Sequence, residues 1–266
     1  MSLGRRAFLV ICAASVLAPG RATARVATSR EPVAVLDAPG VGEDALSSAL
    51  DAIEASGRLR AQLVTPAMIR RGALSSARAV LVTGGRGSRQ GRALGEAGRE
   101  ALRRFVHAGG GYVGICAGSY LAMQVPEGST EESYKAAFVA AAHATGDAWE
   151  RGIAPIEIAS PDGARRVTLH YANGPLFRSV AVEGLPAVRV LARFEGEVFS
   201  ERGGTTAGQM RGAPALLATS YGEGEVVLFS PNPTLEPARP ELLVSALAHV
   251  ARRQPVTSLA MLVDTP

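Results

Sequence analysis

Residues 109–121 read Gly-Gly-Gly-Tyr-Val-Gly-Ile-Cys-Ala-Gly-Ser-Tyr-Leu and place a cysteine between an apolar segment and a segment that can begin a helix. Residues 112–115 are short, apolar and β-prone, as a buried parallel strand should be. Gly114 and Gly118 flank Cys116 at two residues on each side. This spacing is typical of a nucleophile elbow, a strained turn whose small neighbours let strand and helix approach closely. The alternative is a buried structural cysteine, a common fate of a free thiol.

The position of Cys116 before residues 117–123 also predicts its protonation state. A thiol at a helix N-terminus lies near unpaired backbone N–H groups, which favour the thiolate. We therefore expect the pKa of Cys116 to be lowered.

The chain before this turn repeats a pattern of strand, turn and helix. Strands are predicted at residues 33–36, 61–64 and 79–83, and helices at 45–55, from Thr65 and Pro66, and at 95–107, with loops at 37–42 and 86–91. Three such βα units place the strand before Cys116 inside a parallel sheet, with the loops gathered at the carboxyl ends of the strands. The sequence therefore predicts an α/β fold, a flavodoxin-like doubly wound, mostly parallel sheet with helices on both faces.

After the turn at Cys116, the sequence no longer shows a regular alternation of strand and helix patterns. Residues 126–133 are turn-rich and 134–148 are alanine-rich without a decisive period, so loop and short helix are expected up to about Ile153. Further strands are predicted at residues 156–159, 167–170, 188–194, 215–220 and 225–229. Residues 242–253 predict an amphipathic helix with Leu243, Leu247 and Val250 on one face, and the tail beyond Pro255 is expected to be peripheral.

Composition bounds the size and the partners of the molecule. At 266 residues and 47% hydrophobic, the chain can bury a full core as one large domain. The formal charge is +4, but the arginines are spread along the chain, Lys135 is the only lysine, and aromatic residues are only 5%. We therefore expect no nucleic-acid partner, because such proteins cluster their basic residues or interleave them with aromatic ones.

The N-terminus resembles an export signal. Arg5 and Arg6 precede an apolar run that continues to Ala18, and residues 22–24 read Ala-Thr-Ala, a small-residue cleavage pattern. The twin arginines predict twin-arginine export, with general export as the first alternative. A lipoprotein at Cys12 is the second, disfavoured because Ile11 is large for the position before a lipidated cysteine. The apolar run is too short for a stable membrane span. Residues 1–24 are thus predicted to be a signal peptide, 25–266 the mature domain, and the location periplasmic or secreted. Removal of the signal would leave Cys116 as the only cysteine, because Cys12 leaves with it.

Several segments together resemble the N-terminal domain of fungal-type biotin-protein ligases, which belongs to the class I glutamine amidotransferase-like superfamily. The matching segments are Ala38-Pro39-Gly40, Gly84-Gly85, Gly-Ile-Cys-Ala-Gly-Ser-Tyr around Cys116, Tyr-Ala-Asn-Gly-Pro-Leu-Phe at 171–177, Val190-Leu191-Ala192 and residues 222–233. We expect no ligase catalytic domain after this region, so the resemblance does not imply biotinylation.

In the wider superfamily the resemblance implies a cysteine nucleophile, a histidine base and a glutamate behind it, supplied as His-Pro-Glu after a late strand. Alignment of that strand puts Asn232 at the histidine position and Thr234 at the glutamate position. Asparagine cannot take a proton at working pH, and threonine has no imidazole to orient. We therefore predict a degraded triad, because a thiol nucleophile needs a positioned base.

Four histidines are candidates for a replacement base or a metal site. His170 precedes the Tyr-x-Asn-Gly segment and is the candidate base, with simple packing at a strand end as the alternative. His107 fits the capping of a helix end, and His143 and His249 lie in helix-like stretches and are expected to be ordinary surface or packing residues. Without paired spacing or a carboxylate pattern, we expect no metal and no cofactor.

The backbone half of the site is expected to survive, because an oxyanion hole in this fold would use the N–H of Ala117 and one from the Gly84-Gly85 turn. The residues predicted to form the oxyanion hole and the pocket are Gly84, Gly85, Ala117, Tyr171, Asn173 and Gly174. The alternative for the Gly84-Gly85 and Asn173-Gly174 pairs is that they supply only tight turns.

The sequence leaves three functions open. The first is a non-catalytic or weakly catalytic module that binds an unknown small polar ligand. The second is a cysteine-nucleophile amidase or hydrolase that uses Cys116 with a non-standard base such as His170. The third is a redox sensor, which lacks a resolving cysteine.

Overall fold

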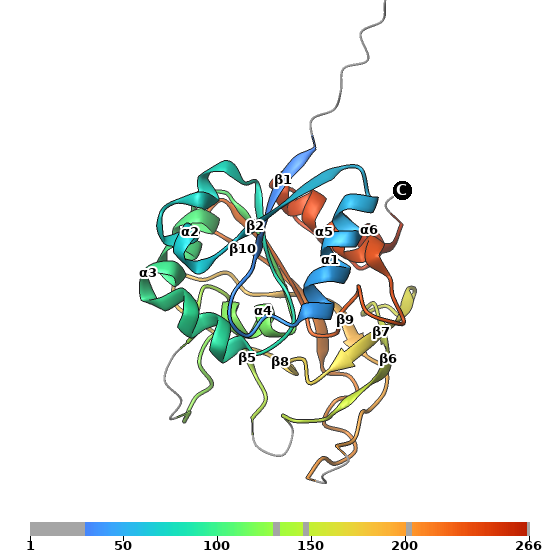
Figure 1. Ribbon diagram of the computed structural model, residues 1–266. Helices are drawn as coiled ribbons and strands as arrows, with labels where there is room; N and C mark the ends of the chain where they lie inside the picture. Colours follow the sequence, from blue (N-terminus) through green and yellow to red (C-terminus); the bar gives the residue numbers. More distant parts are fainter. Residues whose placement is uncertain (1–29, 130–133, 146–148, 201–203, 265–266) are drawn as a thin grey trace, which may run out of the picture.

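The computed structural model of the chain describes residues 30–129, 134–145, 149–200 and 204–264 (Figure 1). The predicted signal peptide and the start of the mature domain at Arg25 lie outside the described residues. Within these ranges, no helix has the length and apolar character needed to cross a bilayer.

A nine-stranded sheet forms the centre of the molecule, in the order β2-β1-β3-β4-β11-β10-β9-β6-β7. Its first half is parallel. The parallel strands are β1 (Glu31–Leu36), β2 (Leu59–Val64), β3 (Ala79–Val82), β4 (Gly111–Ile115) and β11 (Gly224–Phe229). Because these strands run in one direction, the loops after β1, β3, β4 and β11 meet at one edge of the sheet.

The second half of the sheet is antiparallel. It is formed by β10 (Pro214–Tyr221), β9 (Arg189–Phe194), β6 (Ile153–Ala159) and β7 (Arg166–Ala172). A separate two-stranded sheet joins β5 (Ala141–His143) to β8 (Phe177–Ser179). The two halves form one continuous sheet (Figure 1), because β11 pairs with β4 on one side and with β10 on the other.

Helices cover both faces of the parallel half, as predicted (Figure 1). One face carries α1 (Glu43–Ala55), α5 (Pro240–Ala251) and α6 (Ala260–Val263), and the other carries α2 (Pro66–Arg70), a 3-10 turn η1 (Ala73–Ser76), α3 (Gly87–His107) and α4 (Ala117–Ala122). In β1, Val33 and Val35 join the first core while Ala34 and Leu36 join the second. This alternation, with both sets buried, explains why the strand is a continuous apolar run. The α/β prediction is confirmed.

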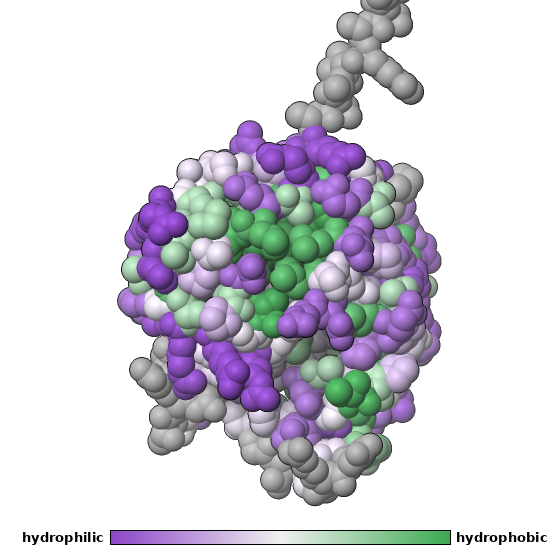
Figure 2. Space-filling view, in the orientation of Figure 1, coloured by the Kyte–Doolittle hydropathy of each residue, from purple (hydrophilic) through white to green (hydrophobic). Residues whose placement is uncertain are grey.

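The sheet ends at β2, which has a neighbour on one side only. Apolar side chains gather on the face of the molecule around this strand (Figure 2). Leu63 of β2 is among the exposed large apolar residues, at 44% exposure.

The prediction of a loop at residues 86–91 is wrong, because α3 already begins at Gly87. Arginines and glycines there hide the helical period, but Gln90 is buried and its Nε2 donates to the backbone oxygens of Thr83 and Gly84. Gly95, with φ 65 and ψ 177, interrupts the helix at the residue where the sequence predicted its start.

Two further expectations are corrected. The alanine-rich stretch before Ile153 contains strand β5, and its described residues contain no helix. The tail beyond Pro255 is not peripheral, since Val256, Leu259 and Leu262 are buried in the core beside α5. In both cases short apolar segments are stabilised by partners distant in the sequence, which local periodicity does not show.

Candidate functional site

The turn at Cys116 has the strained geometry that the glycine spacing predicts. Cys116 has φ 49 and ψ −100, a backbone conformation that non-glycine residues rarely adopt. A Cβ on Gly118 would overlap the carbonyl oxygen of Val82, and a Cβ on Gly114 would lie 2.8 Å from the carbonyl carbon of Gly118. Only glycine permits this approach of strand and helix.

The thiol of Cys116 is partly buried at this edge. Its Sγ donates to the carbonyl oxygen of Ala172 at 3.6 Å. Burial raises the pKa of Cys116 to about 11, and hydrogen bonds from the backbone N–H groups of Gly85 and Ala117 oppose that rise. The predicted lowering of the pKa is therefore wrong, because desolvation of the thiolate outweighs the two backbone donors.

The Gly84-Gly85 turn brings one of those donors to the sulfur. Gly42 N–H donates to the carbonyl oxygen of Gly84 at 3.0 Å, which joins the turn to the loop after β1. Gly85 has φ 130, and a Cβ there would overlap the carbonyl oxygen of Gly40. The pair is thus both a tight turn and the source of a backbone donor at the thiol.

The loop after β11 reaches the same edge. Ile115 pairs with Phe229, so the next residues of both strands, including Cys116 and Asn232, lie close together. From the Cβ position that Gly84 would have, the Cβ of Cys116 lies 3.8 Å away and the Nδ2 of Asn232 lies 3.9 Å away. The aligned histidine position and Cys116 therefore both adjoin the Gly84 turn.

Asn232 is held by Thr234. Its Oδ1 accepts from the backbone N–H of Thr234 at 2.8 Å and from the Thr234 hydroxyl at 2.9 Å. A backbone N–H can only donate, so the amide orientation is fixed and Nδ2 remains the donor end of Asn232. The Thr234 hydroxyl lies 2.8 Å from the hydroxyl of Ser48.

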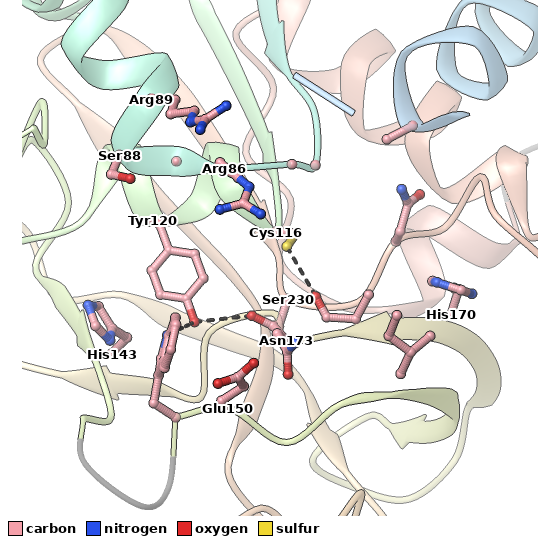
Figure 3. A pocket seen from close by; sticks show the side chains of 18 of the residues that line it. Arg86, Ser88, Arg89, Cys116, Tyr120, His143, Glu150, His170, Asn173 and Ser230 are labelled. Atoms are coloured by element: carbon pink, nitrogen blue, oxygen red, sulfur yellow. Dashed lines mark hydrogen bonds between the residues drawn. The ribbon is translucent and has the colours of Figure 1, made fainter. Parts of the chain in front are cut away.

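His170 lies on the pocket wall but is engaged elsewhere. Its carbonyl oxygen accepts from Asn232 N–H at 2.7 Å, and its ring Nδ1 lies 3.0 Å from the carbonyl oxygen of Glu236. Because a carbonyl only accepts, Nδ1 carries the proton. Within the described residues, no hydrogen bond links an imidazole to Cys116, and Figure 3 shows His143 and His170 on opposite sides of it.

These residues border a cavity of about 840 Å³. Of the predicted pocket residues, Gly84, Gly85 and Asn173 line it, together with Cys116. Asn173 is held by its Oδ1, which accepts from Gly152 N–H at 2.5 Å.

Tyr171, Gly174 and Ala117 do not line the cavity with side chains. Tyr171 faces the core, where its hydroxyl donates to the carbonyl oxygen of Gly174 at 2.9 Å, because residues of a strand alternate between its faces and His170 and Ala172 face the cavity. A Cβ on Gly174 would overlap the backbone of Ser230, so this glycine allows two segments to pack closely. Ala117 contributes its N–H alone.

Sequence reasoning missed several residues of the cavity. Tyr120 and Trp149 line it too. Trp149 Nε1 donates to the Tyr120 hydroxyl at 3.1 Å, and that hydroxyl donates to the carbonyl oxygen of Asn173 at 3.2 Å, with Tyr120 and Asn173 labelled in Figure 3. His143 also lines the cavity. It lies in strand β5, so its placement in a helix-like stretch is wrong, and of the two predicted roles the structure shows packing and not surface exposure.

Metal-ligating side chains do not cluster in the part of the chain that the structure describes. No group of three His, Cys, Asp or Glu side chains converges there.

Comparisons with known proteins agree with this arrangement. Residues 32–134 match the family described as "Biotin-protein ligase, N terminal". A glutamine amidotransferase structure matches with 21% identity and a TM-score of 0.59, over 83% of this chain and 98% of that chain. PurLQS from Thermotoga maritima matches with 13% identity and a TM-score of 0.56, over 83% and 99%. A ThuA-like protein from Parabacteroides merdae matches with 13% identity and a TM-score of 0.52, over 86% and 92%.

No curated protein matches the sequence significantly. The family match confirms the resemblance over residues 32–134, and the structural matches confirm the glutamine amidotransferase-like fold. At these identities the structural matches describe the fold and carry no activity with them.

Proposed function

We propose that this chain, with its biotin-protein ligase N-terminal-like region on a glutamine amidotransferase-like fold, is a binding module. Its pocket at Cys116 holds a small polar ligand without turning it over at an appreciable rate. The observation that carries the proposal is the partner of the thiol: Sγ donates to the carbonyl oxygen of Ala172, and the described residues bring no imidazole to it.

The chemistry of the neighbouring side chains supports this proposal. A thiol whose pKa is about 11 is almost fully protonated at neutral pH. Asn232 and Thr234 bind each other and provide no base, and a positioned general base is worth about 10²- to 10⁴-fold in rate. We therefore infer that the Cys-His-Glu triad is degraded in this chain.

The donors that remain favour binding. The N–H groups of Gly85 and Ala117 point at Sγ, and the Nδ2 of Asn232 lies beside the same turn. Such donors can donate hydrogen bonds to a carbonyl or carboxylate oxygen whether or not a reaction follows.

A cysteine amidase or acyl hydrolase is the second candidate, because the strained backbone of Cys116 and its two N–H neighbours are those of a nucleophile elbow. His170 would be its base, since its ring lines the same cavity. For this role the Cys116 thiol must give up its bond to Ala172 and reach that ring.

The proposal includes export of the protein. A leader with Arg5 and Arg6 would place the binding module in the periplasm or outside the cell, and Cys116 would then be its single thiol. Sequencing the N-terminus of protein recovered from the periplasm tests this, with cleavage near Arg25 as the expected result.

Turnover measured in Cys116→Ala separates the two candidates. Ammonia release from glutamine and hydrolysis of p-nitrophenyl acetate are measured for both proteins at pH 7. We expect equal rates, because the thiol is protonated and has no base. A release rate at least tenfold higher with the thiol present would overturn the binding module, and its loss in His170→Gln would then identify the base.

A further inference from the structure

His143 lines the cavity and has a buried hydrogen-bond acceptor that is unused among the described residues. Its side chain is 8% exposed, and Nδ1 lies 2.8 Å from the carbonyl oxygen of Ala144. Because that carbonyl only accepts, Nδ1 carries the proton and Nε2 carries the lone pair. Within the described residues Nε2 is buried and has no hydrogen-bond partner. A buried acceptor without a partner is costly, so a ligand donor that reaches it is favoured.

The surroundings keep this imidazole neutral. Burial lowers the pKa of His143 to about 4, and the positive charge of Lys135 acts in the same direction. The Tyr120 ring packs edge-on against the imidazole, with ring centroids 4.8 Å apart. At neutral pH the ring is therefore uncharged and can accept a hydrogen bond at Nε2. The positive charge of Lys135 nevertheless disfavours a ligand ammonium near this ring.

A second buried polar atom lacks a partner on the cavity wall. Ser230 follows β11, is 1% exposed, and its hydroxyl makes no hydrogen bond among the described residues. A hydroxyl can donate to a ligand oxygen. Two residues that line the cavity thus each carry a buried polar atom without a partner among the described residues, one an acceptor and one able to donate.

One wall of the cavity is positively charged. Arg86, Arg89 and Arg92 line it where α3 begins, and Glu150 is the one carboxylate among the described residues that line the cavity. The guanidinium of Arg86 points toward Cys116 and Tyr120 (Figure 3). The planar guanidinium fork of arginine matches a carboxylate.

We propose that the cavity binds a small hydroxycarboxylic acid, with its carboxylate against Arg86 and its hydroxyl donating to the Nε2 of His143. The assignment rests on the proposed function as a binding module and names the class of its ligand. A carboxylate without a hydroxyl leaves the Nε2 of His143 unsatisfied, and an amino acid brings an ammonium to a positive wall. A hydroxy acid is complementary both to the arginine side chains, through its carboxylate, and to the Nε2 of His143, through its hydroxyl.

Trp149 is the reporter for the test, because it is the only tryptophan in the chain and lines the cavity. Its fluorescence is titrated with 6-hydroxyhexanoate, hexanoate, 6-aminohexanoate and inorganic phosphate, using the native protein. We expect 6-hydroxyhexanoate to bind about tenfold more tightly than hexanoate, the ratio that one additional hydrogen bond supplies. We expect 6-aminohexanoate and phosphate to bind more weakly than 6-hydroxyhexanoate.

Three variants locate the interactions. His143→Phe keeps an aromatic ring against Tyr120 and should abolish the preference for the hydroxyl while leaving hexanoate binding unchanged. Arg86→Gln should weaken both carboxylates about tenfold, a typical loss for a charge-assisted hydrogen bond. Arg60→Gln, on the edge strand β2 and exposed, is the matched control and should change neither.

The titrations of the native protein can by themselves overturn the proposal, so the test does not depend on whether the variants fold. Equal binding of hexanoate and 6-hydroxyhexanoate, tightest binding of 6-aminohexanoate or phosphate, or no binding of any probe contradicts the ligand class. The proposed binding function fails on a different result, namely turnover that depends on Cys116.

Discussion

Replacing Arg151 by methionine is expected to lower the free energy of unfolding by about 3–5 kcal/mol, the usual cost of removing one partner of a buried ion pair. Arg151 is fully buried. Its guanidinium donates to Glu197 Oε2 at 2.6 Å, to Gln209 Oε1 at 3.0 Å and to the carbonyl oxygen of Val198 at 2.8 Å. Without the guanidinium, these largely buried acceptors lose their charged partner.

The same bonds join two segments beside the cavity. Glu197 also accepts from the backbone N–H groups of Gly208, Met210 and Arg211, so the loop around it is organised by one carboxylate. Arg151 directly follows Trp149 and Glu150, which line the cavity. The loss of stability should therefore be accompanied by weaker ligand binding at this wall.

Urea unfolding measures the effect, with Arg165→Met as the control. Arg165 pairs with Asp264 at 2.8 Å, but both side chains are about half exposed. Pairs of this kind contribute about 0–1 kcal/mol, so the control should lose less than that. A loss below about 1 kcal/mol in Arg151→Met would contradict the structural role assigned to its network.

The second large effect is a gain of thiol reactivity. Asn232→His combined with Thr234→Glu should raise the alkylation rate of Cys116 at pH 7 by about 100-fold or more, the usual range for a positioned base. The pairing of β4 with β11 brings residue 232 to the edge of the sheet that carries Cys116, and Thr234 contacts the side chain at position 232, where a carboxylate can orient the new imidazole. The measurement is iodoacetamide labelling, quantified on the peptide that contains Cys116.

Thr234→Glu alone is the control and should leave the rate unchanged, because it adds no proton acceptor at the sulfur. The unfolding midpoint of each variant shows whether the fold is retained. An unchanged rate in a folded double variant would mean that residue 232 does not reach the thiol.

The sequence predicts the parallel half of the fold well, because its strands are continuous apolar runs separated by glycine and proline. The elbow is equally clear, since Gly114 and Gly118 are required by contacts that leave no space for a Cβ. The start of α3 is not predictable in the same way. Its Gln90 is buried because the side chain donates to the backbone oxygens of Thr83 and Gly84, and a polar residue does not indicate such burial in the sequence.

The cavity is predicted only in part. Gly84, Gly85 and Asn173 are found from motif positions, but His143 is not. Its burial depends on pairing of β5 with β8 and on the Tyr120 ring, both remote in sequence. The protonation of Cys116 was predicted in the wrong direction, because a helix N-terminus is visible in a sequence whereas desolvation of the thiol is not.

The pH dependence of Cys116 alkylation tests the central claim, that the elbow holds a thiol without an activating base. Iodoacetamide labelling of the Cys116 peptide is followed from pH 7 to pH 10. With a pKa of about 11, compared with about 9 for an exposed thiol, labelling at pH 7 should be about 100-fold slower than that of an exposed thiol and should rise about tenfold per pH unit. A fast rate that is already constant below pH 8 would show an activated thiolate and contradict the account.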